Sequence, residues 1–403
     1  MPVALTITEG PHAGQSFTFD RHDTFLVGRT PDCHFRLSFD DPYFSRRHFL
    51  IEINPPRCRV MDLRSRNGIH VNGEKVEAAD LKDGDEVRAG HTVFKVSVQW
   101  PRDPNEPSTL TEPQADQSQA TIAYEPIPSV SIPGYRIEQE LGRGFMGIVY
   151  KAQRESSETT VALKVIAPAP GVPEKQIARF LREAEILGQL RHPNIVGYVD
   201  GGQVNGLVFL AMEYLTGPDM ARVLADKGPM KPSTAVRIIC QVLTGLQHAH
   251  EKGYVHRDIK PANIILNTEN SKRVAKLADF GLARVFESSR LSGLTMQGET
   301  GGTPAFMAPE QVTHYRDVTP AADQYSVAAT LYSFLANAYP YDMPKNVWQG
   351  LVKVVTQEPV PIRDRRPDIA EKLAAVIHKA LNREPNERYS SADEFRRALL
   401  EFK

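Results

Sequence analysis

A proline-rich stretch from residue 99 to residue 134 divides this sequence into two parts with different patterns. Prolines recur between Pro101 and Pro133, and Gln, Ser, Thr and Glu fill much of the space between them. Such a stretch offers too few apolar side chains to offset the conformational entropy that folding would cost. We therefore predict an extended, disordered linker over residues 99–134, with one folded part before it and another after it.

The composition is that of an ordinary globular protein with two or more domains. The 403 residues are 41% hydrophobic and 24% charged, and the formal net charge of −1 favours neither nucleic acid nor an acidic membrane. The three cysteines form no CxxC pair, which argues against a zinc ribbon or a disulfide scaffold. No signal peptide and no apolar run near the ~20 residues of a membrane helix is evident. We predict a cytoplasmic protein with no membrane span and no nucleic-acid partner.

Residues 1–98 carry the pattern of many short strands. Segments such as residues 3–7 and 49–53 are rich in β-branched and aromatic side chains that partly alternate with polar ones. Turn pairs such as Asn67-Gly68 and Asp83-Gly84 separate these segments. Short strands at this spacing predict an all-β sandwich.

The part from residue 135 to residue 403 begins with strands and continues with helices. Residues 135–166 predict a β meander, and residues 327–338 predict a buried helix. Ser391 and Glu394 match a capping box at the start of the last helix. Helical apolar spacing recurs at residues 176–189, 235–250, 370–381 and 391–402. A β-rich start followed by a helical body predicts two lobes.

A glycine-rich segment and a lysine stand near the start of this second part. Residues 141–149 contain the pattern GxGxxGxV, which lets backbone N–H groups approach phosphate oxygens but also fits a plain hairpin. Lys164 follows in an apolar segment and has two interpretations. It is either a surface lysine of an edge strand, or a lysine inside a cleft with a phosphate and a carboxylate as partners. Glu183, in the next predicted helix, is the candidate carboxylate.

Three further motifs supply the context that decides between these interpretations. Residues 256–263 read HRDIKPAN, residues 279–281 read DFG, and residues 308–310 read APE. In this order and at these intervals, the motifs resemble those of the eukaryotic-like (Hanks-type) serine/threonine protein kinases of bacteria. The resemblance covers residues 135–403 and implies a bilobal α+β kinase fold with ATP bound between the lobes.

The resemblance also implies a role for each motif residue. Lys164 would hold the α- and β-phosphates and pair with Glu183. Asp258 would orient the substrate hydroxyl and accept its proton, with Lys260 near the transferred phosphate. Asn263 and Asp279 would hold Mg²⁺, with Mn²⁺ as an alternative metal. The ATP site would comprise Leu141, Gly142, Gly144, Gly147, Val149, Lys164 and the hinge residues Glu213 and Leu215.

The type of acceptor follows from the same resemblance. Lys260, two residues after Asp258, is typical of serine/threonine kinases and usually absent from tyrosine kinases. Thr303 would lie in the loop that meets the acceptor. Because none of the catalytic residues is missing, the sequence does not favour a pseudokinase.

Arg257 beside the catalytic aspartate suggests regulation by phosphorylation. An arginine at this place suits a phosphorylated residue of the activation loop, which adds about −1.5 to −2 charge. We predict autophosphorylation at Thr295 or Thr300, with Thr300 preferred because it is nearer to Thr303.

The N-terminal part carries a second set of motifs. Gly28-Arg29, Ser45 to His48 and the segment from Asn67 to Gly73 resemble the forkhead-associated (FHA) domain, a β-sandwich that recognises phosphothreonine. Arginine forks and hydroxyl donors suit a phosphate dianion. The resemblance places the phosphate on Arg29, Ser45 and Arg46 and the peptide backbone on Asn67, while His48 braces the loop. Arg66 occupies a contact position but fits a solvated arginine equally well.

Two internal contacts are also expected from the kinase resemblance. Asp323 would brace the catalytic loop. Glu310 and Arg388 would form a buried ion pair that is costly to break from one side.

The two parts together predict a multidomain protein: an FHA domain over residues 1–98, the linker over 99–134 and a kinase domain over 135–403. The predicted function is phosphorylation of protein Ser/Thr hydroxyls, including its own. The FHA domain would bind other phosphothreonine proteins or the chain's own linker at Thr109, Thr111 or Thr121, and a homodimer could form during trans-autophosphorylation. A scaffold that only binds, and a small-molecule kinase, are the alternatives.

Overall fold

The computed structural model describes residues 2–37, 43–98, 131–144, 147–168, 174–188, 190–269, 271–280 and 304–403. Residues 99–130 of the predicted linker lie outside these ranges, as do Thr295, Thr300 and Thr303. Of the remaining predicted linker residues, Ile132 is buried and packs into the core of the sheet that follows.

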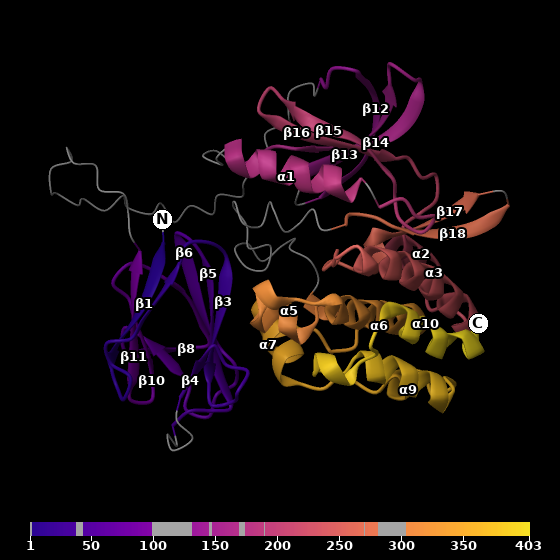
Figure 1. The fold of residues 1–403 in the computed structure, drawn as a ribbon. Helices are drawn as coiled ribbons and strands as arrows, with labels where there is room; N and C mark the ends of the chain where they lie inside the picture. Colours follow the sequence, from indigo (N-terminus) through magenta and orange to yellow (C-terminus); the bar gives the residue numbers. More distant parts are fainter. Residues whose placement is uncertain are drawn as a thin grey trace.

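Residues 3–98 form a β-sandwich, which confirms the predicted fold of this part (Figure 1). One sheet has the strand order β2-β1-β11-β10-β7-β8 and the other β4-β3-β5-β6-β9. Alternation places Val3, Leu5 and Ile7 in the core between the sheets, each at most 1% exposed. The strands are β1 (Val3–Glu9), β2 (Ser16–Phe19), β3 (Asp23–Gly28), β4 (Phe35–Arg36), β5 (Arg47–Asn54), β6 (Arg57–Asp62), β7 (Ile69–Val71), β8 (Glu74–Val76), β9 (Ala78–Leu81), β10 (Glu86–Ala89) and β11 (Thr92–Val98).

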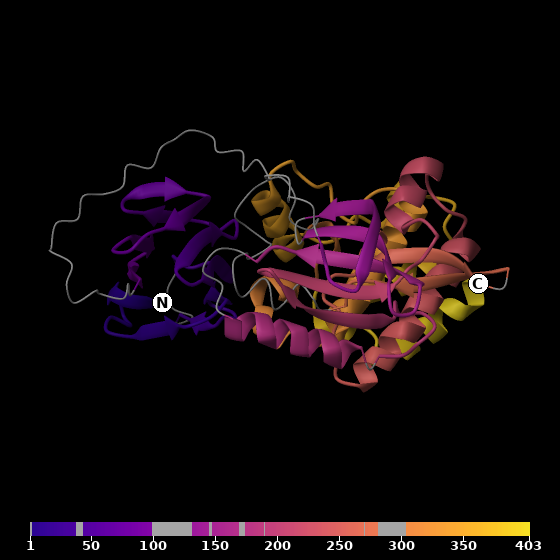
Figure 2. The ribbon, with the colours of Figure 1, turned by 90° about the horizontal axis from the view of Figure 1, so that it is seen from above.

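The second part begins with a five-stranded antiparallel sheet of order β12-β13-β14-β16-β15. Helix α1 (Glu174–Leu187) lies along this sheet (Figure 2), where Ile177 and Phe180 pack against Ile166 and Leu210. The strands are β12 (Tyr135–Gly144), β13 (Gly147–Arg154), β14 (Thr159–Ile166), β15 (Tyr198–Val204) and β16 (Leu207–Glu213).

The remaining residues form a helical lobe built around α3 (Pro232–Glu251) and α6 (Pro320–Ala336). The predicted buried helix at residues 327–338 is the C-terminal part of α6, whose Val327, Leu331 and Phe334 are fully enclosed. Ser391 Oγ accepts a hydrogen bond from Glu394 N at 3.1 Å, which is one half of the predicted capping box, while Glu394 Oε2 accepts from Ser390 N. Within the described ranges, no helix is both long and apolar enough to span a membrane.

The other elements of this lobe are mostly short. The helices are α2 (Met220–Lys227), α5 (Pro309–Thr313), α7 (Val347–Thr356), α8 (Ile362–Arg365), α9 (Glu371–Ala380) and α10 (Ala392–Leu399). A two-stranded sheet pairs β17 (Ile264–Glu269) with β18 (Lys272–Leu277). The 3₁₀ helices are η1 (Pro261–Asn263), η2 (Pro304–Phe306), η3 (Tyr315–Asp317), η4 (Pro385–Glu387) and η5 (Leu400–Phe402).

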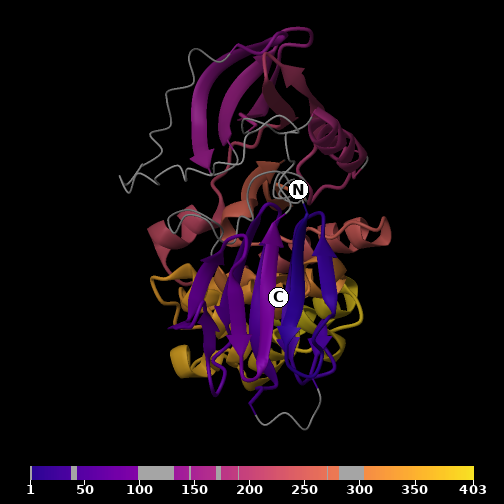
Figure 3. The ribbon, with the colours of Figure 1, turned by 90° about the vertical axis from the view of Figure 1, so that its left-hand side faces the viewer.

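The sandwich packs directly against the helical lobe rather than standing apart from it (Figures 1 and 3). Leu26, Leu50 and Met61 from the β3-β5-β6 sheet share one apolar cluster with Leu351 and Val355 of α7. Such burial is the main favourable term in association between protein surfaces. We call this contact the domain interface. The sequence predicted two parts joined by a flexible linker, and it gave no sign of this contact.

Polar contacts fix the position of the sandwich on the helical lobe. Thr24 Oγ1 donates to the carbonyl oxygen of Thr313 at 3.0 Å in a buried hydrogen bond. Arg316 pairs with Asp23 at 3.1 Å. The Arg59 guanidinium lies 4.1 Å from the centre of the Trp348 ring. Helix α5 begins within the APE motif, and η3 comes shortly after it. The sandwich therefore contacts the segment that follows the activation loop in the sequence.

Leu351→Asp should open the domain interface. The substitution would bury an unpaired carboxylate between the two parts, and separating them would expose it to water. We expect small-angle X-ray scattering to give a larger radius of gyration for this variant than for the wild type. Gln203→Asp adds the same charge at an exposed position of β15 and should leave the radius unchanged. An unchanged radius for Leu351→Asp would contradict a stable interface.

Candidate active site

Lys164 lies on the central strand β14, where it pairs with Val149 of β13 and Leu210 of β16. The side chain is only 6% exposed, and its Nζ lies 2.9 Å from Asp279 Oδ1. Desolvation alone would raise the pKa of Asp279, but the charge and hydrogen bond of Lys164, together with His256 and Lys260, hold that pKa below its usual value. Asp279 is therefore ionised at neutral pH. This arrangement fits the cleft interpretation of Lys164 and not that of an edge-strand surface lysine.

Glu183, the predicted partner of Lys164, lies within α1. Its side chain is outside the part of the chain that the structure describes, so the predicted Lys164–Glu183 pair stays a prediction. The partner seen for Lys164 is Asp279, the predicted metal ligand.

Asp258, Lys260 and Asn263 are joined by short hydrogen bonds. Lys260 Nζ and Asn263 Nδ2 each donate to Asp258 Oδ2 at 2.9 Å. Asn263 Nδ2 also donates to the Asp258 backbone oxygen at 2.7 Å. Two residues of the motif HRDIKPAN, Lys260 and Asn263, thus converge on the carboxylate of a third. The remaining oxygen, Asp258 Oδ1, is the one that can face an incoming hydroxyl.

Asp323 of α6 braces the catalytic loop, as the sequence predicted. Its two carboxylate oxygens accept from the backbone N–H groups of His256 and Arg257, each at 2.8 Å. His250 Nε2 approaches Asp323 Oδ2 at 2.7 Å, a contact that sequence reasoning missed. Burial tends to raise the pKa of Asp323, but His250, His256 and the Arg257 backbone N–H together lower it. A fully buried carboxylate is thereby kept ionised as an anchor.

Two residues of the site have a left-handed backbone. Arg257 has φ of 69° and Asp279 has φ of 58°. Residues with a Cβ rarely adopt this backbone region. Those that do cluster at functional sites, where surrounding contacts hold the backbone in place. Here the holding contacts are those of Asp323 to the backbone of Arg257 and of Lys164 to Asp279.

The described glycines of the glycine-rich segment lie at the end of β12 and the start of β13. Gly142 pairs with Val149, and Gly144 with Gly147, while Leu141 is largely exposed. Gly147 has φ of +135°, and a Cβ there would lie 2.1 Å from the carbonyl oxygen of Val165. A glycine is therefore required at this position by the close approach of β14, whatever the loop binds.

The predicted hinge residue Glu213 ends β16 and uses its side chain to reach the other lobe. Its carboxylate oxygens lie 2.8 and 3.1 Å from Lys276 Nζ on β18. Although desolvation works against the charge of Lys276, Glu213 and Glu269 raise the pKa of this lysine. Sequence reasoning missed Lys276, because a lysine in a strand of alternating pattern reads as a solvated side chain. The carboxylate of Glu213 is thus engaged with Lys276.

Glu310 and Arg388 form the predicted buried ion pair. Two parallel hydrogen bonds of 2.6 and 2.8 Å join the guanidinium to the carboxylate. The Arg388 side chain is fully enclosed and also donates to the backbone oxygens of Asn382 and Ala321. The next residue, Gln311, donates to the backbone oxygen of Arg257 at 2.7 Å and so ties α5 to the catalytic loop.

The donor set fits a hard divalent cation. Asn263 turns its amide nitrogen toward Asp258, which leaves its side-chain oxygen as an acceptor, and Asp279 is ionised. Oxygen ligands of this kind, completed by phosphate oxygens and water, are what Mg²⁺ prefers. No cluster of three or more His, Cys, Asp or Glu side chains suited to a metal occurs within the described ranges.

The predicted phosphate-contacting residues of the sandwich lie together on neighbouring loops. Arg29 N and Thr30 Oγ1 both donate to the backbone oxygen of Arg46, at 2.8 and 3.1 Å. A Cβ at Gly28 would lie 2.3 Å from that same oxygen, so Gly28 allows the two loops to meet. Ser45 Oγ accepts from Arg66 N at 2.9 Å, which links the third predicted loop to the other two.

His48 is buried behind these loops and braces them, as expected. Its Nδ1 accepts from Ser45 N at 3.1 Å, and its Nε2 lies 3.2 Å from the Gly68 backbone oxygen. Asn67 Nδ2 donates to the backbone oxygen of Tyr43 at 2.8 Å. The side chains of Arg46 and Arg66 are exposed, so both remain accessible to a ligand.

The comparison with protein families is decisive for the larger part of the chain. Residues 135–399 match the family described as "Protein kinase domain". The chain belongs to the protein kinase family. Residues 25–90 match the FHA domain.

Two bacterial serine/threonine-protein kinases are similar to the chain. The chain is 36% identical to serine/threonine-protein kinase pkn3 of Myxococcus xanthus, over 69% of this chain and 50% of that protein. It is also 36% identical to PknH of Mycobacterium tuberculosis, over 66% of this chain and 41% of that protein. The chain thus spans about half, or less, of the length of these curated relatives.

Solved structures agree with the fold. The kinase domain of Mycobacterium tuberculosis PknI has a TM-score of 0.54 and 31% identity, covering 68% of this chain and 98% of that one. A Rad53 fragment solved with AMP-PNP covers 98% of both chains, with a TM-score of 0.52 and 23% identity. At that identity, the likeness to Rad53 concerns the fold alone.

Proposed function

We propose that this chain transfers the γ-phosphate of ATP to Ser and Thr hydroxyls of proteins. The observation that carries the proposal is the pair of clusters in one site: Asp258 with Lys260 and Asn263, and Lys164 with an ionised Asp279. Phosphoryl transfer depends on positioning and charge neutralisation more than on covalent help from the protein. Together, the two clusters supply groups that can position the substrates and neutralise the phosphate charge.

Each side chain has one task in this reaction. Asp258 orients the hydroxyl and takes its proton while the hydroxyl oxygen bonds to the γ-phosphorus and the bond to the β–γ bridging oxygen breaks, which releases ADP. Lys164 holds the α- and β-phosphates, and Lys260 offsets charge on the transferred group. Asn263 and Asp279 would hold Mg²⁺, which neutralises phosphate charge when bound. The backbone around Glu213 and Leu215 and the side chains of Leu141 and Val149 would enclose the adenine.

Transfer of ³²P from ATP to a generic protein, followed by phosphoamino-acid analysis, tests this proposal. We expect phosphoserine and phosphothreonine, with no phosphotyrosine. A protein that only binds would transfer nothing, and a small-molecule kinase would leave proteins unlabelled.

We further propose that the FHA domain binds phosphothreonine peptides through Arg29, Ser45 and Arg46, with Asn67 and Arg66 toward the peptide. The support is the meeting of these loops around Ser45 and the backbone of Arg46. Such peptides could come from other proteins or from the linker of this chain. The phosphopeptide reader would then be residues 1–98, the linker residues 99–134 and the kinase residues 135–403. Autophosphorylation would occur at Thr295 or Thr300, between the two chains of a transient homodimer.

Arg29→Ala should weaken phosphothreonine-peptide binding by about 10- to 100-fold, because a charge-assisted hydrogen bond contributes roughly 1.5–3 kcal/mol. Fluorescence anisotropy with a labelled peptide measures this loss. Arg88→Ala is the matched control, because Arg88 pairs with Glu9 on the exposed part of β10. The affinity of this variant for the peptide should equal that of the wild type. Equal affinity for Arg29→Ala would remove Arg29 from the phosphate site.

A further inference from the structure

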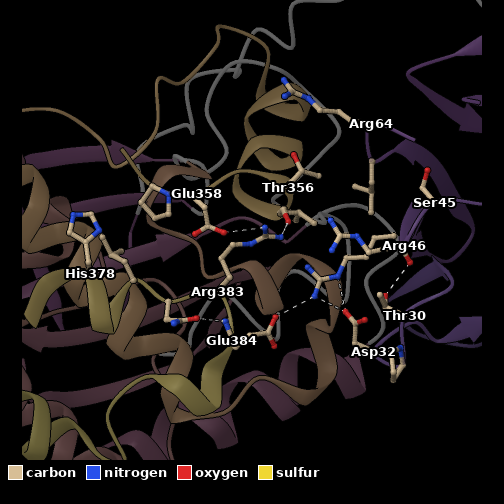
Figure 4. Close-up of a pocket in the computed structure, with 17 residues that line it drawn as sticks. Thr30, Asp32, Ser45, Arg46, Arg64, Thr356, Glu358, His378, Arg383 and Glu384 are labelled. Carbon is tan, nitrogen blue, oxygen red and sulfur yellow. Dashed lines mark hydrogen bonds and ion pairs between the residues drawn. The ribbon is translucent and has the colours of Figure 1, made fainter. Parts of the chain in front are cut away.

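The domain interface leaves an open cleft of about 970 Å³ between the sandwich and the helical lobe (Figure 4). Ser45 and Arg46, two of the proposed phosphate-contacting residues, line one wall. The opposite wall belongs to the kinase domain and includes Thr356, Glu358 and Glu384. Ligand pockets in proteins typically measure about 300–1,000 Å³, so this space can hold several residues of a peptide.

The two walls carry opposite charge. Arg46 and Arg64 are exposed on the sandwich side. On the kinase side, the carboxylates of Glu358 and Glu384 are 77% and 67% exposed. A phosphate held by the sandwich would therefore leave the neighbouring residues of its peptide beside two acidic side chains.

The cations near these carboxylates hold them only loosely. Arg383 lies 3.6 Å from Glu358 and also donates to the Val355 backbone oxygen. Arg47 makes its close contact with Asp32 at 2.7 Å and lies 3.9 Å from Glu384. Both carboxylates thus have lone pairs left for a ligand, because neither is held by a bidentate pair.

We propose that the phosphopeptide is read jointly by both domains, and that Glu358 and Glu384 of the kinase domain select a lysine or arginine next to the phosphothreonine. This proposal rests on the proposed phosphothreonine reading by the FHA domain. It assigns the kinase domain a role in ligand choice that does not involve its active site.

Charge selection also bears on the source of the peptide. Between residues 99 and 134, the linker holds one basic residue, Arg102, and five acidic residues. A phosphorylated Thr109, Thr111 or Thr121 would bring further negative charge to the acidic wall. The cleft therefore favours a basic phosphothreonine segment of another molecule over the linker of the same chain.

Peptide binding to the full chain tests joint reading. Two phosphothreonine peptides would be compared by fluorescence anisotropy, one with lysines and one with glutamates beside the phosphothreonine, together with a phosphorylated peptide of residues 106–116. We expect the lysine peptide to bind about 5- to 10-fold more tightly than the other two, from two exposed ion pairs of up to about 1 kcal/mol each.

The double variant Glu358→Lys/Glu384→Lys should abolish or reverse this preference. Glu251→Lys/Glu401→Lys changes the net charge equally at exposed sites elsewhere and should keep it. Thermal melting of each variant checks the fold. Joint reading is overturned if both double variants prefer the lysine peptide to the same extent. It is also overturned if the wild type shows no preference for that peptide. If the wild type binds no phosphopeptide at all, the proposed FHA function itself fails.

Discussion

Asp258→Asn should reduce phosphoryl transfer to protein substrates by about 10²- to 10⁴-fold, the usual contribution of a general base. An asparagine has nearly the same shape, so the loop should keep its place under the backbone hydrogen bonds to Asp323. What is lost is the acceptor for the hydroxyl proton. The initial rate of ³²P incorporation at saturating ATP measures this effect.

Asp393→Asn is the matched control for that experiment. Asp393 lies at the start of α10, where it pairs with Arg396 on the surface. Loss of the Asp393 charge should keep the transfer rate within about twofold of the wild-type rate, because exposed ion pairs contribute little to stability. A transfer rate of Asp258→Asn equal to that of the control would show that Asp258 is not the base.

Arg388→Ala should lower the free energy of unfolding by about 3–5 kcal/mol, the usual effect of removing one partner of a buried pair. Glu310, whose side chain is only 13% exposed in the wild type, would lose its bidentate partner, and the backbone oxygens of Asn382 and Ala321 would each lose a donor. Urea unfolding followed by the fluorescence of Trp348, which lies in the same lobe, measures the loss.

Arg363→Ala offers the comparison at the surface. Arg363 pairs with Glu371, and both side chains are well exposed, so we expect a loss of less than about 1 kcal/mol. If both variants lose the same amount, the Glu310–Arg388 pair does not hold the helical lobe together.

Tyr315 of η3 contacts both the sandwich and the loop that carries Arg257. The ring of Tyr315 in η3 lies 4.2 Å from that of His22, and Arg257 approaches the backbone oxygen of Tyr315 at 3.5 Å. Only one residue thus separates the sandwich from the arginine beside the catalytic aspartate.

The sequence was most informative where chemistry demands particular residues. The kinase motifs and the FHA motifs predicted the folds of both parts, and buried contacts such as Asp323 to the catalytic loop followed from the same resemblance. These features depend on residues that are close in sequence or that occupy fixed motif positions.

Contacts between surfaces could not be predicted in this way. Leu26 and Leu351 meet across the domain interface, yet along the chain each looks like an ordinary core residue of a strand or a helix. The pairing of Lys276 with Glu213 likewise depends on how two lobes are placed. No periodic pattern in a single chain specifies which apolar or charged faces will meet.

Intact-mass and peptide mass spectrometry after incubation with Mg²⁺ and ATP tests the kinase activity most directly. The wild-type chain should gain phosphate in steps of one group, on Ser and Thr alone, while Asp258→Asn should gain it about 10²- to 10⁴-fold more slowly under the same conditions. If the wild-type chain and an added protein substrate both keep their mass, that result would contradict the central claim.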